Sequence, residues 1–147
     1  MKEEKLVSQE EILRQKEYMR EVRARNAGRP LHALVDTYGC QQNEADSEIL
    51  RGMLLEMGYA MTEREDEADV VVINTCAVRE HAEMRVLGNV GALVHTKRRR
   101  PGQIIAICGC MAQQAHMVEK IKNSYHHVDL VFGTHALYRF PELLLRV

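Results

Sequence analysis

The sequence lacks any apolar run long enough to cross a membrane, and its first eleven residues lack the apolar core of a secretory signal peptide. It also lacks an excess of either charge, because 20 Lys and Arg face 21 Asp and Glu, for a formal net charge of -1. Net charge therefore gives no indication of a nucleic-acid partner, and any such binding has to come from a local patch. We expect a cytoplasmic protein with no membrane partner.

The sequence also lacks internal repeats, low-complexity tracts, a G-x-G-x-x-G fingerprint and a P-loop. These absences argue against a repeat protein and weaken the case for a nucleotide-binding or flavin-binding α/β module, which stays an alternative. What is present is a chain of 147 residues with 46% apolar and 28% charged residues. This composition is typical of one globular domain with a real hydrophobic core.

Helix and strand patterns divide the chain at about residue 30. Residues 1–30 are polar and favour helix, so we expect one or two amphipathic helices docked on the domain, or a partly mobile extension. After them, short apolar strands alternate with amphipathic helices, which predicts an α/β domain at 31–147. We expect a three-layer Rossmann/flavodoxin-like fold with a parallel sheet of about five strands. The expected strands are 31–37, 59–62, 70–73, 103–107 and 128–132, and the main helices are 43–57 (with Asn43 as N-cap), 75–96 and 111–123.

Three of the four cysteines follow expected strands. Cys40 follows the first strand, Cys76 the third and Cys110 the fourth. In open α/β sheets, ligands bind outside the carboxyl ends of the strands. If the strand order is 2-1-3-4-5, these three strands are adjacent, and the outer two lie roughly 10 Å apart. The three cysteines could then converge on one small inorganic group, although buried apolar cysteines remain the alternative.

Cysteine chemistry favours an iron–sulfur cluster at this position. A metal ligand must be a thiolate, and clusters held by cysteine alone are well established. Cys108 alternates with Cys110 along the strand, so we interpret Cys108 as a buried strand residue. Zinc sites usually show close ligand pairs such as C-x2-C, and the histidines here are scattered apart from the pair His126 and His127. Zinc binding is kept as an alternative.

The segments around these cysteines resemble a known family. Residues 37–48 (TYGCQQNEADSE), 74–80 (NTCAVRE) and 109–113 (GCMAQ) are similar to the three cysteine motifs of the N-terminal domain of radical S-adenosylmethionine methylthiotransferases. Residues 128–135 (VDLVFGTH) resemble the segment that closes this domain. The resemblance covers about residues 31–146, and three motifs in the same order are specific together.

The resemblance implies a 4Fe–4S cluster on Cys40, Cys76 and Cys110, with a second 4Fe–4S cluster and S-adenosylmethionine in a separate radical core. Residues 41–43 (QQN) and 78–80 (VRE) are closest to the branch that modifies tRNA. That branch adds a methylthio group to C2 of N6-isopentenyladenosine near the anticodon and needs a sulfur donor. A different tRNA base or a ribosomal protein is the alternative substrate.

The sequence departs from the family in two ways. It has no C-x3-C-x2-C motif for a radical core and no TRAM-like RNA-binding module. We therefore expect a fragment of a transferase that is inactive by itself, whose missing domains belong to the same polypeptide. The surface around the cysteines is expected to be an interface with exposed polar residues, namely Gln41, Gln42, Asn43, Thr75 and Gln113. The basic turn at 97–100 is either a solvated helix end or a contact for RNA phosphates.

Overall fold

Parallel strands form one sheet in the part of the chain that the structure, a computed structural model, describes: residues 8–38, 41–75 and 80–147. The strands are β1 (His32–Thr37), β2 (Ala60–Met61), β3 (Val70–Thr75), β4 (Ile104–Gly109) and β5 (Leu130–Phe132). They lie in the order β2-β1-β3-β4-β5, and each neighbouring pair is parallel. The order expected from the sequence is confirmed.

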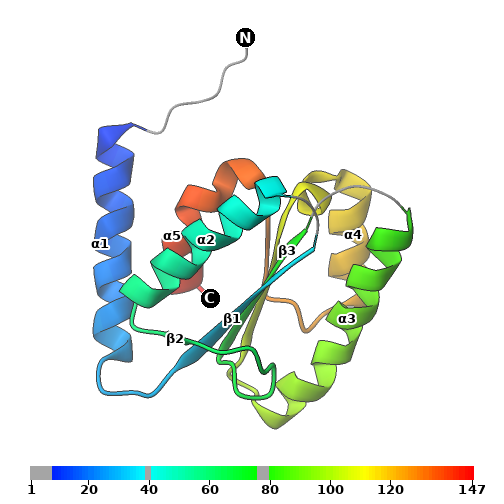
Figure 1. Ribbon diagram of the computed structural model, residues 1–147, viewed down its shortest axis with the longest axis horizontal. Helices are drawn as coiled ribbons and strands as arrows, with labels where there is room; N and C mark the ends of the chain where they lie inside the picture. Colours follow the sequence, from blue (N-terminus) through cyan, green and yellow to red (C-terminus); the bar gives the residue numbers. More distant parts are fainter. Residues whose placement is uncertain (1–7, 39–40, 76–79) are drawn as a thin grey trace.

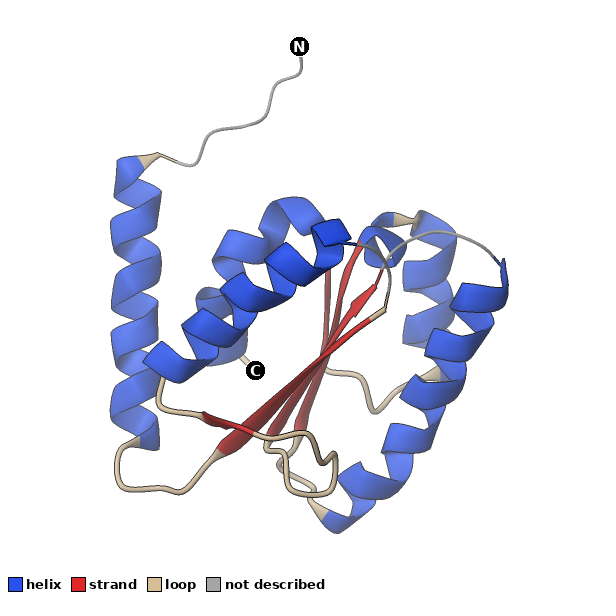
Figure 2. Cartoon of the chain, in the orientation of Figure 1, coloured by secondary structure: helices blue, strands red, loops and turns tan. Residues whose placement is uncertain are grey.

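Helices cover both faces of this sheet, which gives three layers (Figures 1 and 2). On one face α2 and α5 pack against the strands, with α1 beside them, and on the other face lie α3 and α4. The predicted α/β class is confirmed. The helices are α1 (Gln9–Asn26), α2 (Gln41–Glu56), α3 (Glu80–Arg99), α4 (Ala115–Ser124) and α5 (Phe140–Leu145), with 3-10 turns η1 (Cys110–Gln113) and η2 (Thr134–Arg139).

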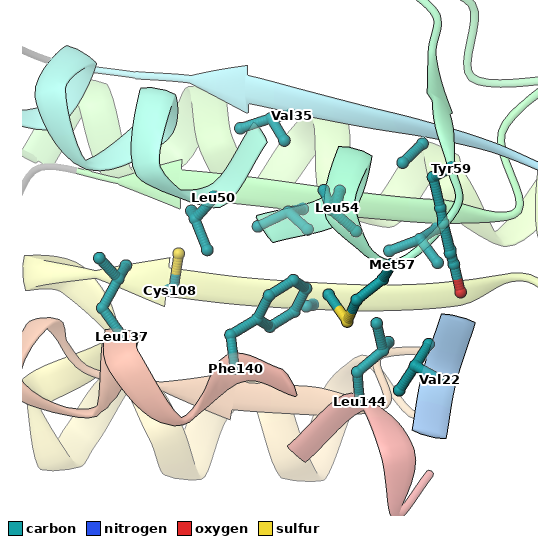
Figure 3. Packing of buried hydrophobic residues seen from close by; sticks show 14 of the residues in the cluster. Val22, Val35, Leu50, Leu54, Met57, Tyr59, Cys108, Leu137, Phe140 and Leu144 are labelled. Atoms are coloured by element: carbon teal, nitrogen blue, oxygen red, sulfur yellow. The ribbon is translucent and has the colours of Figure 1, made fainter. Parts of the chain in front are cut away.

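The central strand β3 is buried on both faces because helices cover both. Val70 and Val72 face the cluster formed with α2 and α5, whereas Val71 and Ile73 face the cluster formed with α3 and α4. This alternation explains the continuous β-branched run that the sequence shows there. Figure 3 shows the first cluster, in which Leu50, Leu54 and Phe140 meet between α2, the sheet and the C-terminal helix. Burying each such side chain contributes about 1.5–3 kcal/mol.

The N-terminal extension forms one docked helix over its described residues. Ser8 caps α1, because its Oγ accepts the backbone N–H of Glu11 at 3.1 Å. The otherwise polar α1 is held by Val22, which is 4% exposed within the core, and by Gln15. The Gln15 amide donates to Glu142 Oε1 at 3.2 Å and accepts from the Glu142 backbone N–H at 3.3 Å. None of the described helices is long and apolar enough to cross a lipid bilayer.

Three expected helices differ from the structure. Asn43 does not cap α2, which begins at Gln41; its side chain instead bonds to Asn74 and to the carbonyl of Thr75. The helix expected from 111 to 123 is divided into η1 and α4. The backbone N–H of Met111 donates to Thr75 Oγ1, which ties the start of η1 to β3. The helix expected to open at 75–76 also differs, because Thr75 still belongs to β3.

Candidate functional site

The carboxyl ends of β1, β3 and β4 lie side by side. The register pairs Thr37 with Asn74, and Thr75 with Gly109, at the ends of these strands. Each strand end then continues into a cysteine: Cys40 is three residues beyond Thr37, Cys76 follows Thr75, and Cys110 follows Gly109. The described residues on either side of the three cysteines therefore lie at one edge of the sheet, as predicted.

The three predicted ligands differ in how far the structure places them. Cys40 and Cys76 lie outside the described residues. Cys110 opens η1 and is exposed to solvent as a free thiol. The assignment of the three cysteines as ligands therefore stays a prediction, and the structure supplies the frame around it.

Gly109 lets β4 end close to β3. Its φ is +99°, a left-handed conformation that side chains other than glycine rarely adopt. A Cβ atom at this position would collide with the carbonyl oxygen of Thr75 and would lie 2.8 Å from Asn74 Oδ1. Glycine is therefore required here, and it delivers Cys110 directly beside the end of β3.

Cys108 belongs to the core rather than to the exposed edge. Its side chain is 0% exposed, lies among the apolar residues of the cluster in Figure 3, and donates to Asn74 Oδ1 at 3.8 Å. Burial, with a further contribution from the Asp46 carboxylate, raises the pKa of the Cys108 thiol to about 12. Since metal ligation requires a thiolate, Cys108 is a poor ligand. Its interpretation as a buried strand residue is confirmed.

A buried amide pair connects the end of β3 to the start of α2. The Asn74 amide, 0% exposed, donates to the Asn43 carbonyl oxygen at 2.9 Å and to Ser47 Oγ at 3.0 Å. The Asn43 amide returns two bonds, to Asn74 Oδ1 at 3.3 Å and to the Thr75 carbonyl oxygen at 2.8 Å. Ser47 Oγ lies a further 2.6 Å from Thr37 Oγ1. Side-chain hydrogen bonds therefore join β1, β3 and α2 within a few residues of Cys40 and Cys76 in the sequence.

Thr75 extends this network to β4 and η1. Its hydroxyl donates to the Cys108 carbonyl oxygen at 2.7 Å and accepts the Met111 backbone N–H at 3.2 Å. The expectation that Asn43 and Thr75 are exposed is wrong, because they are 4% and 0% exposed and bonded within the fold. Gln113 is exposed as expected, whereas the side chains of Gln41 and Gln42 lie outside the described residues. The NTC pattern showed the strand end, but nothing local in the sequence showed that its asparagine bonds to α2.

His127, one of the two neighbouring histidines considered for a zinc site, makes a contact within the fold. A ring nitrogen of His127 (Nε2) lies 2.7 Å from the Val90 carbonyl oxygen, so this histidine joins two packed segments. Within 8–38, 41–75 and 80–147, no three His, Cys, Asp or Glu side chains are placed to hold a metal ion.

In the basic turn, Lys97 pairs with Asp129 at 2.6 Å and Arg100 with Asp69 at 2.9 Å.

A surface hollow of about 870 Å³ runs along β1 and α2, beside the cysteine edge. Five carboxylates line it together with Arg51, which already pairs with Glu48 at 2.9 Å. Burial and the neighbouring charge of Asp36 raise the pKa of Glu65 there. Such an acidic lining suits an exposed strand edge that is protected from pairing with other chains. The carboxylates are Asp36, Glu44, Glu48, Glu63 and Glu65.

Comparison with known proteins places the fold and its motifs in a family. Residues 32–133 match the model of a family described as Uncharacterized protein family UPF0004. The chain belongs to this family. The match to UPF0004 covers the whole sheet, from the first residue of β1 to the residue after β5.

Curated relatives of this UPF0004 chain are named tRNA-2-methylthio-N(6)-dimethylallyladenosine synthase. The relative from Alkaliphilus oremlandii is 52% identical over 96% of this chain, and the one from Thermoanaerobacter sp. is 51% identical over 94%. The relative from Clostridioides difficile is 48% identical over 92% of this chain. The chain spans only 29–30% of the length of these relatives. The resemblance to the tRNA branch of the methylthiotransferases is confirmed.

The described edge fits a cluster held by cysteine. Neighbouring strands lie about 4.8 Å apart, so the adjacent ends of β1, β3 and β4 span roughly 10 Å. Cys110 is exposed at that edge, whereas Cys108 is withdrawn into the core. The bonded side chains beneath the edge are amides and hydroxyls, which add no further negative charge to a group of thiolates.

Proposed function

We propose that this chain is the iron–sulfur-cluster-binding domain of a tRNA methylthiotransferase, with Cys40, Cys76 and Cys110 as ligands of a 4Fe–4S cluster. One observation carries the proposal: three adjacent strand ends each lead, within three residues, to a cysteine. Random placement of core cysteines would not repeat the same position three times. The fourth cysteine, Cys108, breaks the pattern in sequence and is buried, whereas Cys110, the other cysteine that the structure describes, is exposed.

The substrate proposed for the longer protein follows the printed name of its relatives. That protein adds a methylthio group to C2 of N6-isopentenyladenosine in tRNA, near the anticodon, in the cytoplasm. Cys40, Cys76 and Cys110 would hold the cluster, which would supply the inserted sulfur. A radical core with S-adenosylmethionine and a second cluster, and an RNA-binding domain, belong to the same polypeptide. A sulfur donor is the further partner.

The chain's own residues hold and orient the ligands in this proposal. Gly109 brings Cys110 beside β3, and Thr75 fixes the backbone that continues into Cys76. Asn43, three residues after Cys40, is fixed against the same strand. Burial keeps the Cys108 thiol protonated and therefore out of the ligand set.

Anaerobic reconstitution of the 147-residue chain tests the cofactor. We expect about four iron and four sulfide per chain, with the broad visible absorption of a thiolate-bound cluster. Zinc supplied alone in a parallel sample is the competing metal. Stoichiometric zinc retained without sulfide, together with no iron uptake, would replace the cluster with a zinc site.

A nucleoside assay tests whether this domain can methylthiolate tRNA without the radical core. The reconstituted chain is incubated with reductant, S-adenosylmethionine and tRNA that contains N6-isopentenyladenosine, and the digested nucleosides are analysed by mass spectrometry. We expect no methylthiolated product, because the sequence holds no second three-cysteine motif. Product from this chain alone would mean that the radical chemistry resides here.

A further inference from the structure

Asn74 lies at the centre of the polar network below the cysteine edge. It is the penultimate residue of β3, two residues before Cys76, and its side chain is fully buried. Its amide reaches across to α2 rather than along its own strand. Its backbone carbonyl oxygen also accepts the N–H of Tyr38 at 2.8 Å, two residues before Cys40. One residue therefore contacts the chain on both sides of Cys40.

Each cysteine-bearing segment is bonded to this centre within three residues of its cysteine. Asn43, three residues after Cys40, bonds to Asn74 and to the carbonyl oxygen directly before Cys76. The Met111 N–H, directly after Cys110, bonds to the hydroxyl of Thr75. Described residues of the three segments are thus joined by one set of hydrogen bonds.

We propose that Asn74 and Asn43 are positioning residues that set the spacing of the Cys40, Cys76 and Cys110 segments before a cluster binds. The inference rests on the proposed function for the identity of the ligands. Neither asparagine touches the cluster; each acts through the backbone that carries the thiols. Outer-shell hydrogen bonds of this kind typically change metal affinity by roughly 10–100-fold when removed.

A matched residue at the opposite end of the sheet separates positioning from simple stability. Gln103 is also a buried amide, 2% exposed, and directly precedes β4. It donates to the carbonyl oxygens of Glu65 at 3.0 Å and Ala68 at 2.8 Å, and accepts from Thr96 Oγ1 at 2.9 Å. Alanine at either position removes at least three side-chain hydrogen bonds. Only Asn74 lies next to cysteines.

The test compares Asn74→Ala and Gln103→Ala in the 147-residue chain. We expect similar decreases in thermal midpoint for the two variants. After anaerobic reconstitution, iron loss to an added chelator should be roughly tenfold or more faster in Asn74→Ala than in the parent, and unchanged in Gln103→Ala. Equal iron loss from all three proteins, or equal acceleration in both variants, would overturn the positioning role.

A second readout works without a cluster. Phenylarsine oxide, which binds two neighbouring thiols, is added to the metal-free proteins, and the adduct is measured by intact mass. The parent and Gln103→Ala should form the two-thiol adduct, and Asn74→Ala several-fold less. If the parent takes up no cluster, the proposed function fails while this assay still decides the inference. Equal adduct in Asn74→Ala and parent would contradict it.

Thr75→Val serves if Asn74→Ala does not fold. Valine keeps the branched shape of the strand residue but removes the hydroxyl that binds the Cys108 carbonyl oxygen and the Met111 N–H. We expect accelerated iron loss and less two-thiol adduct involving Cys110. A Thr75→Val protein that matches the parent in both assays would overturn the role of the network.

Discussion

The two edges of the sheet are held together by different chemistry. At the amino edge, Asp69 accepts the His32 backbone N–H at 2.8 Å and pairs with Arg100. Asp129 likewise accepts the Ile105 N–H at 2.9 Å and pairs with Lys97. At the carboxyl edge, the bonded groups are neutral amides and hydroxyls, with glycine at the closest approach.

This difference fits the cluster that we propose for the carboxyl edge. The amino-edge carboxylates are partly exposed, so water and their basic partners balance their charge. A carboxylate bonded directly below several thiolates would instead raise their pKa and weaken metal ligation. Neutral amides give the same directional bonds without that cost. The comparison teaches that buried asparagine, not aspartate, suits the edge that carries the cysteines.

Alanine at the two edge glycines should give the largest contrast in stability. Gly109→Ala places a Cβ against the Thr75 carbonyl oxygen at a left-handed φ, so we expect a loss of about 3 kcal/mol or more in the free energy of unfolding. Gly102→Ala, at the amino edge, meets nothing within 4 Å and should stay within about 0.5 kcal/mol of the parent. Urea unfolding measures both. Equal losses would show that the close approach of β3 and β4 is not tight.

The buried amide of Gln103 should contribute to the free energy of unfolding but not to cluster binding. Gln103→Leu removes three hydrogen bonds, after which the Glu65 carbonyl oxygen still accepts the Ala68 N–H and the Thr96 hydroxyl still donates to the Leu93 carbonyl oxygen, so we expect a loss of about 1–2 kcal/mol. Iron and sulfide content after reconstitution should equal that of the parent. A Gln103→Leu protein that folds but takes up no iron would show that the two edges are coupled.

The amino-edge ion pairs should contribute least to stability. Lys97→Met removes a pair whose side chains are 21% and 25% exposed, so we expect a loss of about 0.5–1 kcal/mol that shrinks in high salt. Arg98→Met, in the same last turn of α3, is the control and should change stability by less. Chemical unfolding at low and high salt measures the difference. A loss that does not change with salt would argue for packing rather than charge.

The two cysteines that the structure describes should differ in reactivity, with no change in stability involved. The pKa of Cys108 is about 12 and its thiol is buried, whereas the Cys110 thiol is exposed. At about pH 8 in the folded, metal-free chain, iodoacetamide should modify Cys110 and spare Cys108. Both should react once the chain is unfolded. Peptide mapping by mass spectrometry reads the result, and rapid native labelling of Cys108 would place it outside the core.

The positions of the strands could be predicted because their signals are local, whereas the order 2-1-3-4-5 is the common one for such sheets and has no local signal. The run 70–73 is continuous and β-branched, as a strand covered on both faces requires. The cysteines could be placed at strand ends because each directly follows such a run or its short turn. The resemblance of three motifs then added the cofactor and the reaction class, which no spacing alone would have supplied.

The bonded frame of the site could not be predicted in the same way. Asn43 near a helix start has the same local signature whether it caps the helix or bonds to a neighbouring strand. Only the position of α2 against β3 decides that its amide turns toward Thr75. Likewise, the start of η1 bonds to a hydroxyl 36 residues earlier in the chain. Such contacts between distant segments leave no periodic trace in the sequence.

Iron and sulfide analysis of four single variants tests the central claim most directly. Cys40→Ala, Cys76→Ala, Cys110→Ala and Cys108→Ala are reconstituted anaerobically beside the parent chain. The account predicts that the first three lose the cluster, because each removes a ligand, whereas Cys108→Ala largely keeps it. Iron and sulfide at the parent stoichiometry in Cys76→Ala, or loss of the cluster in Cys108→Ala alone, would contradict the assignment.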